Sequence, residues 1–344
     1  MDVAKARKEE ITYSMIEILY KAFEIKTANL ETENNNPFKQ AFLSNMDYND
    51  ENDIRNKSIF FSIIKWLNDS IAMQKFFEKT AHILSDGEKR EYTSQKLGNL
   101  NLSTVQKNNI NEIITNLSIG KNTPNMQREN TVLYKLDNSE LTSALDFSAD
   151  VFIEDENEIT AIELKSVRPN SGEMRGEKHK ILEGKCALYN KNPDKKVNFF
   201  LGFPFDPISG FPTKYDKERF MDSIINLRKY FDKNEILLAS ELWDFLSGTK
   251  NTMEFLLKII NKISTPEFID RYRFVNDVSN IGTSKYLDYL REWNLYSQLL
   301  LTGKDEIIRK AIRGDKRLIK IYNQQMFKDG EYNYNRFEKL SRLI

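Results

Sequence analysis

The residues best suited to chemistry in this chain are three charged side chains within two short apolar segments. Asp150 lies in the segment SADVFIED, and Glu163 and Lys165 lie in the segment EITAIELKSV. Both segments are rich in Val, Ile, Phe and Thr, and only the acidic turn around Glu156 and Asn157 separates them, which is typical of a β-hairpin. Because side chains two residues apart on a strand share a face, Glu163 and Lys165 project together.

Pairing of the two strands would place Asp150 near Glu163 and supply two oxygen donors for a hard cation such as Mg²⁺. Two carboxylates packed together repel each other unless a cation lies between them. A Lys165 ammonium close to a metal-bound water can stabilise hydroxide or neutralise charge in a phosphorane-like transition state. Asp146 and Glu129, upstream of the hairpin, are further candidate ligands. The structural alternative is an exposed ladder of cross-strand ion pairs.

Other catalytic schemes find little support in the sequence. The chain has two histidines, His82 and His179, whereas most nucleophilic and metal-hydrolase schemes need a histidine placed near a partner. Cys186 lies within a helical pattern beside apolar residues, which favours packing over thiol chemistry. The segment Gly120–Thr123 resembles part of a phosphate-binding loop, but Thr115 stands where the upstream glycine is required. The carboxylate and lysine set is therefore the best candidate for an active site.

The segment SVRPNSGEMRGEKHK, residues 166–180, follows the hairpin and is the best candidate for DNA contact. A loop that enters a helix N-terminus supplies backbone N–H groups and guanidinium donors to phosphates or guanine edges. Residues 160–196 contain nine Lys or Arg against five Asp or Glu, a local excess of four that the neutral total conceals. The alternative is a solvated helix face. The predicted DNA-binding residues are Arg168, Arg175, Lys178, Lys180 and Lys185.

The elements that must hold these residues form a mixed α/β core between two helical regions. Residues 28–57 have the composition of a loop, and KVNFFLGFPF predicts a buried strand. Apolar residues at spacings of three and four predict helices over 4–27, 58–84, 103–117 and 176–189, and from Lys217 almost to the end, including 256–263 and 307–321. We therefore divide the chain into a helical N-terminal region (1–125), an α/β core (126–250) and a helical C-terminal region (251–344).

Composition limits the partners and the compartment. Lys and Arg number 51 and Asp and Glu number 51 among 344 residues, so a nucleic-acid partner must be met by a local basic patch. A single cysteine cannot form an internal disulfide. The sequence contains neither an apolar run suited to a signal peptide nor the stretch of about 18 apolar residues that a spanning helix needs. We expect a cytoplasmic protein with no membrane segment.

A resemblance to a known family rests on two short motifs. Ser148-Ala149-Asp150, twelve intervening residues and Glu163-Leu164-Lys165 resemble the active-site signature of the PD-(D/E)xK nuclease superfamily and, within it, type II restriction endonucleases. That family places its Asp on one strand and its (D/E)xK motif on the next, with a helix following. Ala149 stands where the family has its name-giving proline, a position that carries no ligand. The resemblance covers about residues 146–203.

The resemblance implies a function and a site. It implies a restriction-endonuclease-like α/β core and a bacterial type II restriction enzyme that hydrolyses double-stranded DNA at a short specific site, usually as a homodimer. It further implies that Asp150 and Glu163 hold Mg²⁺ and that Lys165 positions or activates the attacking water. Two alternatives remain open. One is a nuclease of the same superfamily that acts in DNA repair or recombination without sequence specificity, and the other is a non-enzymatic DNA-binding protein.

Overall fold

The computed structural model of the chain describes residues 3–32, 71–165 and 173–344. Most of the predicted loop over 28–57 and the first half of the predicted helix over 58–84 lie outside these residues. None of the helices in the described part of the chain is long and apolar enough to span a membrane.

The chain forms two compact units that do not coincide with three consecutive regions. One unit is Ala81–Glu254, and the other combines Met1–Thr80 with Phe255–Ile344. The sequence analysis started the α/β region at residue 126, but residues 81–125 belong to the same unit. The reason is a strand early in the unit that pairs with the predicted hairpin, although residues 93–146 of the sequence lie between them.

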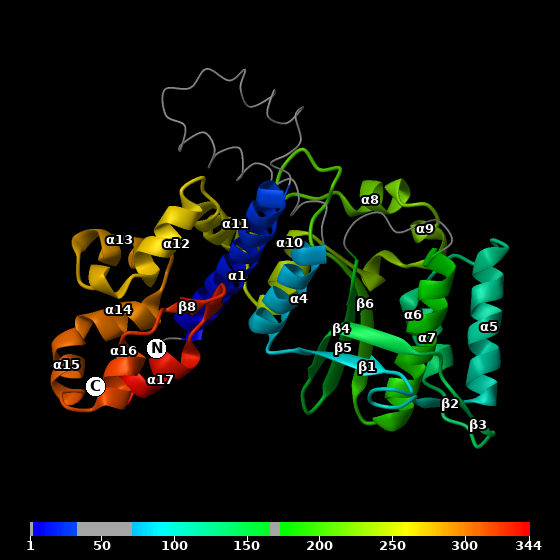
Figure 1. The fold of residues 1–344 in the computed structure, drawn as a ribbon. Coiled ribbons are helices and arrows are strands. Elements are labelled where there is room, and N and C mark those ends of the chain that lie inside the picture. The colour runs from blue at the N-terminus through cyan, green and yellow to red at the C-terminus, as the bar shows by residue number, and fades with distance from the viewer. Residues whose placement is uncertain (1–2, 33–70, 166–172) are drawn as a thin grey trace. The chain divides into compact units, whose positions relative to one another are not determined.

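A five-stranded mixed sheet is the centre of the unit Ala81–Glu254 (Figure 1). The first three strands in the sheet are antiparallel and the last three are parallel, which confirms the mixed α/β class. Their order is β1 (Glu88–Tyr92), β4 (Phe147–Glu154), β5 (Glu158–Leu164), β6 (Lys196–Phe203) and β7 (Ile236–Leu238).

Strands β4 and β5 form the predicted hairpin, with Val151 paired to Ile162. The turn is held by Asp155, whose carboxylate accepts hydrogen bonds from the backbone N–H groups of Asn157 and Glu158, both at 2.8 Å. Val151 and Ile162 are fully buried, which fixes the register because a slip by one residue would expose the apolar face.

Helix α7 (Glu173–Lys191) packs on strands β4 and β6, and helices α5 (Thr104–Ser118) and α6 (Met126–Leu133) pack on α7 (Figure 1). Helix α7 connects the parallel strands β5 and β6, as a crossover must. It packs closely on β4, since a Cβ added at Gly184 would lie 3.1 Å from the ring of Phe147. The core between these helices consists of Leu102, Ile110, Ile114, Leu133, Ala144, Leu182, Cys186 and Ala187.

Shorter elements complete the unit. Sequence analysis did not predict β1, whose sequence EKREY is charged at four of five positions. Gly202 on β6 lies against α10, and its missing side chain leaves room for Leu242. The remaining elements are β2 (Asn101–Ser103), β3 (Leu141–Ser143), α8 (Lys217–Ser223), α9 (Leu227–Tyr230), the 3-10 helix η1 (Lys233–Glu235) and α10 (Ser240–Ser247). Helices α4 (Ile71–Ser85) and α11 (Thr252–Ile263) cross the boundaries between the units.

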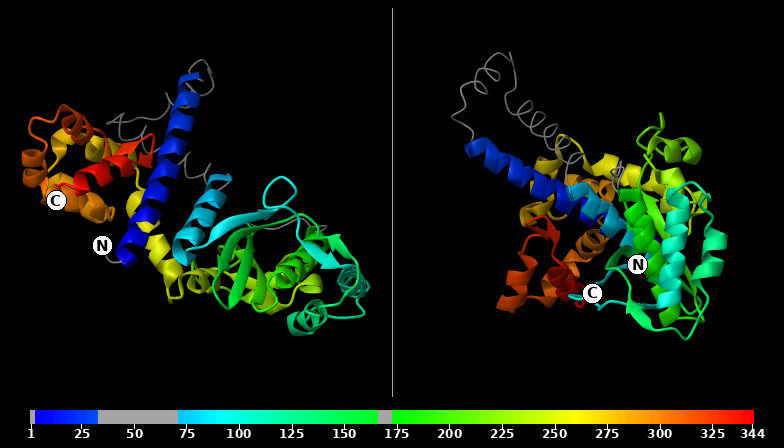
Figure 2. Two further views of the ribbon diagram at one scale, coloured as in Figure 1. Left: turned by 90° about the horizontal axis from the view of Figure 1, so that it is seen from below. Right: turned by 90° about the vertical axis from the view of Figure 1, so that its right-hand side faces the viewer.

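The other unit is almost entirely helical (Figure 2). Buried Glu9 accepts hydrogen bonds from the backbone N–H and the hydroxyl of Ser297, and Tyr13 stacks on Tyr332. Its elements are α1 (Val3–Thr32), α12 (Phe268–Asn276), η2 (Val278–Asn280), α13 (Ser284–Glu292), α14 (Tyr296–Gly303), α15 (Asp305–Ala311), α16 (Lys316–Tyr322), β8 (Phe327–Lys328), β9 (Glu331–Tyr332) and α17 (Tyr334–Ser341). The helix predicted over 307–321 is two helices, α15 and α16, because Gly314 between them has a φ of +89°.

A buried charge cluster fixes the beginning of α7. The Lys178 ammonium lies 2.6 Å from Glu129 of α6 and 2.7 Å from both carboxylate oxygens of Glu235 in η1. All three side chains are inaccessible, with exposed fractions of 0, 3 and 1%. Burial lowers the pKa of Lys178, but the two carboxylates outweigh it and the pKa is raised. Burial also raises the pKa of Glu129. The ammonium therefore stays charged and holds three elements together.

Replacing Lys178 by Met should lower the free energy of unfolding by about 3 kcal/mol or more, because two carboxylates then stay buried without a cation. Urea denaturation followed by circular dichroism measures this change. The matched control is Lys191→Met at the exposed end of the same helix, which should change stability by less than about 0.5 kcal/mol. Equal effects of the two substitutions would show that the cluster does not stabilise the fold.

Candidate active site

The two predicted metal ligands lie side by side on the β4–β5 hairpin. The register that pairs Val151 with Ile162 places Asp150 opposite Glu163 when it is continued by one residue. Both residues are largely buried, with exposed fractions of 7 and 8%. Asp150 is oriented by the backbone, because its Oδ2 accepts a 2.9 Å hydrogen bond from the N–H of Leu164. Its second oxygen, Oδ1, is thereby left to face other charged groups.

Lys165 completes the predicted triad and contacts two carboxylates. Its Nζ lies 3.4 Å from Oε1 of Glu163 and 3.1 Å from Oε1 of Glu177. Its side chain is 14% exposed, so the ammonium is partly withdrawn from water. The structure thus brings Asp150, Glu163 and Lys165 together at the end of the hairpin.

Helix α7 adds two charged residues to this group. Nζ of Lys180 lies 3.1 Å from Oε2 of Glu177 and 3.7 Å from Oε1 of Glu163. Sequence analysis predicted Lys180 as a DNA contact and did not consider Glu177. The signal was available, because a crossover helix begins where the preceding parallel strand ends, so its first turns adjoin Lys165.

The donor set fits a hard cation. Burial raises the pKa of Glu163, and the charge of Asp150 raises it further, while Lys180 and Lys165 lower it. A cation between the two carboxylates would favour the ionised form of Glu163 and so offset both its burial and its repulsion by Asp150. Among the described residues no group of three or more His, Cys, Asp and Glu side chains is arranged to hold a metal. A metal held by Asp150 and Glu163 would complete its shell with other oxygens, as Mg²⁺ commonly does.

A third lysine reaches the site from β1, and the sequence analysis missed it. Nζ of Lys89 lies 2.9 Å from Oδ1 of Asp150. Glu88 pairs with Phe152 and Arg90 pairs with Ala149, so two residues of β4, Asp150 and Val151, oppose the single residue Lys89. This is a β-bulge, a device that redirects side chains and is frequent beside active sites.

Two further side chains, those of Ser148 and His82, contact the hairpin at this point. Ser148 donates a 3.3 Å hydrogen bond from Oγ to Oε2 of Glu163. Nε2 of His82 donates a 2.6 Å hydrogen bond to the backbone carbonyl of Asp150. His82 therefore positions the strand and does not itself face the carboxylates. Ala149, where the superfamily has its proline, is fully buried.

The predicted DNA-binding residues separate into three groups. Arg175 is exposed on the first turn of α7, and Lys180 lies in the charged site. Arg168 lies outside the described residues. The prediction for Lys178 and Lys185 is wrong, because both are inside the protein, with exposed fractions of 0 and 1%.

The helix geometry explains this correction. Residues 178, 182 and 185 follow spacings of four and three, so Lys178 and Lys185 share the buried face with Leu182. Lys178 is neutralised by the cluster described above, and burial lowers the pKa of Lys185 to about 8. A lysine is normally exposed, but the spacing of Lys178 and Lys185 from Leu182 places both on the buried face of α7.

The two further candidate ligands lie elsewhere. Glu129 binds Lys178 in the buried cluster, and Asp146 accepts a hydrogen bond from Asn99. The hairpin carboxylates are thus not joined by either residue.

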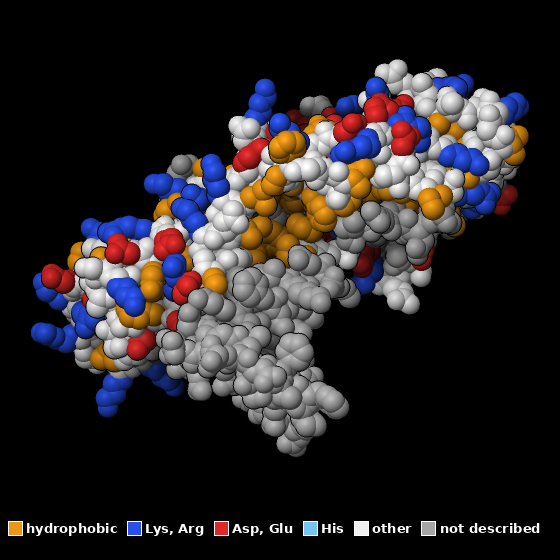
Figure 3. Space-filling view, turned by 90° about the horizontal axis from the view of Figure 1, so that it is seen from above, with side chains coloured by type: hydrophobic (Ala, Val, Ile, Leu, Met, Phe, Trp, Pro, Cys, Tyr) orange, Lys and Arg blue, Asp and Glu red, His pale blue; other side chains and the backbone are white. Residues whose placement is uncertain are grey.

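On the face shown in Figure 3, Lys and Arg are interspersed with Asp and Glu, in keeping with their equal totals.

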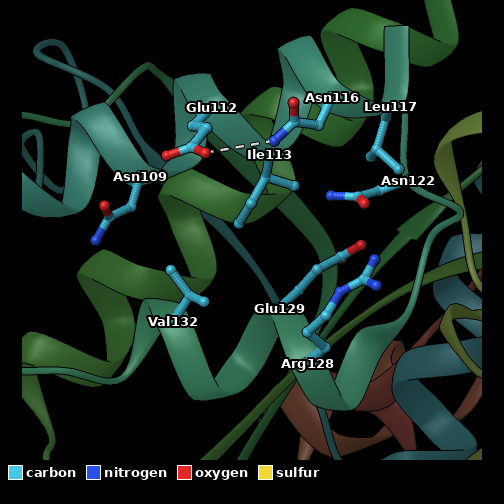
Figure 4. A pocket seen from close by; sticks show the side chains of 9 residues that line it. All are labelled: Asn109, Glu112, Ile113, Asn116, Leu117, Asn122, Arg128, Glu129 and Val132. Carbon is cyan, nitrogen blue, oxygen red and sulfur yellow. Dashed lines mark hydrogen bonds between the residues drawn. The ribbon is translucent and has the colours of Figure 1, made fainter. Parts of the chain in front are cut away.

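A pocket of about 190 Å³ lies between α5 and α6 and is separate from this site (Figure 4). None of its lining residues belongs to β4 or β5. Glu112 and Asn116 on α5 face it and hydrogen-bond to each other at 3.5 Å. The lining residues are Asn109, Glu112, Ile113, Asn116, Leu117, Asn122, Arg128, Glu129 and Val132.

Comparison with known proteins identifies the family. The family model described as "Type II restriction endonuclease, HinfI" matches residues 4–264. The "Type II restriction enzyme MjaII" of Methanocaldococcus jannaschii is 38% identical over 371 aligned positions, which cover 100% of this chain and 98% of the relative. No solved structure matches the chain. These matches favour a site-specific endonuclease over both alternatives left open by the sequence. The chain belongs to the HinfI family of type II restriction endonucleases and is a site-specific deoxyribonuclease.

Proposed function

We propose that Asp150, Glu163 and Lys165 form the active site of a PD-(D/E)xK core that hydrolyses double-stranded DNA with Mg²⁺. The observation that carries this proposal is the pair of buried carboxylates on adjacent strands with an ammonium 3.4 Å from Glu163. No other part of the described chain combines these groups with the spacing of the superfamily signature.

Each residue has a distinct task in this proposal. Oδ1 of Asp150 and the carboxylate of Glu163 would hold the cation, since Oδ2 of Asp150 is engaged by the N–H of Leu164. Mg²⁺, when bound, polarises the phosphate and lowers the pKa of its water ligand. The Lys165 ammonium orients the attacking water and offsets the negative charge that develops on the phosphate.

Lys165 is held for this task by a second carboxylate. Glu177 lies 3.1 Å from its Nζ, closer than Glu163 does, and itself contacts Lys180. The ammonium thus has a fixed location near both the proposed ligands and the exposed beginning of α7. Positioning of this kind reduces the reorganisation required at the moment of reaction.

The first turn of α7 is the proposed entry of DNA to the site. Arg175 is exposed two residues before Glu177, which contacts both Lys165 and Lys180. Arg168, beyond the described residues, stays a prediction for the same surface. We further propose that the enzyme acts as a homodimer on a palindromic site, because a two-fold symmetric dimer matches the symmetry of a palindrome. We place its activity in the bacterial cytoplasm.

Asp150→Asn and Lys165→Met should each reduce cleavage roughly 100-fold or more, the effect expected when one catalytic group is lost. Incubation with phage DNA and Mg²⁺, followed by gel electrophoresis, measures the rate from discrete fragments. The controls are Glu156→Gln in the exposed hairpin turn and Lys191→Met, both of which should cut normally. Wild-type cleavage by either active-site variant, with a native circular dichroism spectrum, would remove that residue from the reaction.

Glu163 predicts the pH dependence of metal binding. The pKa of Glu163 is raised above 4.5, so this carboxyl group takes up a proton at a higher pH than an ordinary glutamate does. Because the proton competes with the metal for the carboxylate, the affinity for Mg²⁺ should begin to fall at a higher pH than it would at an ordinary glutamate. Calorimetric titration of Mg²⁺ at several pH values measures this. In the metal-free protein the folded state binds more protons than the unfolded state between pH 4.5 and the raised pKa of Glu163. The free energy of unfolding therefore decreases as the pH rises through this range, and above it the ionised Glu163 destabilises the fold.

Glu163→Gln should therefore stabilise the protein in EDTA at neutral pH, and the gain should vanish below about pH 4, where both states are protonated. Thermal denaturation at the two pH values tests this. Glu156→Gln, on the exposed turn, should produce no such difference. A destabilised Glu163→Gln variant at neutral pH would contradict the assigned rise in the pKa of Glu163 by burial and by the charge of Asp150.

Arg175→Ala should weaken DNA binding and reduce the salt slope by about one, as expected for the loss of one phosphate contact. Fluorescence anisotropy with a DNA duplex in EDTA at several salt concentrations measures both quantities. Lys191→Ala, at the opposite end of α7, is the matched control and should leave them unchanged. An unaltered affinity and slope for Arg175→Ala would exclude this turn from the DNA interface.

A further inference from the structure

The ion pair between Lys89 and Asp150 has no role in the proposed reaction as described so far. The bulge in β4 sets Asp150 and Val151 against Lys89 alone and directs the ammonium to a distance of 2.9 Å from Oδ1 of Asp150. Its neighbours on β1 pair elsewhere, since Arg90 binds Glu88 and Glu154. Lys89 is the residue of β1 that reaches the carboxylate site.

The atom that Lys89 contacts is the atom that a metal would need. Oδ2 of Asp150 already accepts the N–H of Leu164, so Oδ1 is the oxygen left for a cation. An ammonium at hydrogen-bond distance from Oδ1 and a metal bound to the same oxygen compete for one charge. Their binding to Asp150 is therefore mutually unfavourable.

The ammonium of Lys89 is also able to move away from Asp150. Its side chain is 37% exposed, whereas that of Asp150 is 10% exposed, so the ammonium lies at the solvent side of the pair. An ion pair with one partner this accessible contributes little to stability. The four-carbon stem of lysine can move to solvent, or to a DNA phosphate, without movement of the strand.

We propose that Lys89 is an internal counter-ion that occupies the metal-binding oxygen of Asp150 in the free enzyme and keeps its metal affinity low until the ammonium withdraws. A DNA phosphate, as a competing anion, draws Lys89 away from Asp150. DNA binding and metal binding then favour each other, since each is easier when Lys89 has left Asp150. This inference rests on the proposed metal site at Asp150 and Glu163.

Calorimetric titration of Mg²⁺ into the full-length protein without DNA tests the proposal independently of cleavage. Lys89→Met should bind Mg²⁺ about fivefold more tightly than wild type, the size expected for removal of one partly exposed competing charge. Lys89→Arg, which retains the cation, should stay close to wild type. The matched control Lys96→Met removes an exposed lysine that pairs with Glu91 and should not change the affinity.

The outcomes separate this inference from the proposed active site. Unchanged or weaker Mg²⁺ binding by Lys89→Met would overturn the counter-ion role, because removal of a competitor cannot weaken binding. A gain equal to that of Lys96→Met would also overturn it, since it would reflect net charge alone. If Asp150→Asn leaves the Mg²⁺ affinity of the wild type unaltered, the metal site itself is wrong and both proposals fail.

Discussion

The placement of the Asp150 and Glu163 carboxylates beside each other is the constraint on which the proposed active site depends. The hairpin register forces the two residues to face each other, and both are nearly withdrawn from water. Such a pair is unfavourable alone, because burial raises the pKa of Glu163 and the charge of Asp150 raises it further. Three lysines from different parts of the unit lie close to these carboxylates and offset their negative charge. They are Lys89 on β1, Lys165 directly after β5 and Lys180 on α7. The fold thus concentrates opposite charges around one position.

The parts of this site that were predictable from sequence are those encoded locally. The hairpin follows from two short segments rich in Val, Ile, Phe and Thr on both sides of a short acidic turn, and its register then places Asp150 near Glu163. Lys165 follows from its spacing of two from Glu163 on the same strand. The helix after β5 was likewise visible in its apolar spacing, within a few residues of α7.

The parts that were not predictable depend on contacts between distant segments or on misjudged exposure. Strand β1 has four charged residues of five and becomes a strand only by pairing with β4, so no local pattern reveals it or Lys89. Lys178 and Lys185 were assigned to a DNA surface from residue type, although their spacing from Leu182 places them on the buried face. The sequence predicts one helix over 307–321, but Gly314 has a positive φ and lies between the two helices α15 and α16.

The neighbouring residues Glu177 and Lys178 on α7 link the stability of the protein to the precision of its site. Successive residues of a helix point about 100° apart, so one of the pair enters the core while the other faces Lys165. Insertion of Lys178 between Glu129 and Glu235 sets both the rotation and the depth of the helix. The buried contacts of Lys178 therefore also fix the orientation of Glu177, which holds the Lys165 ammonium in place at the proposed active site.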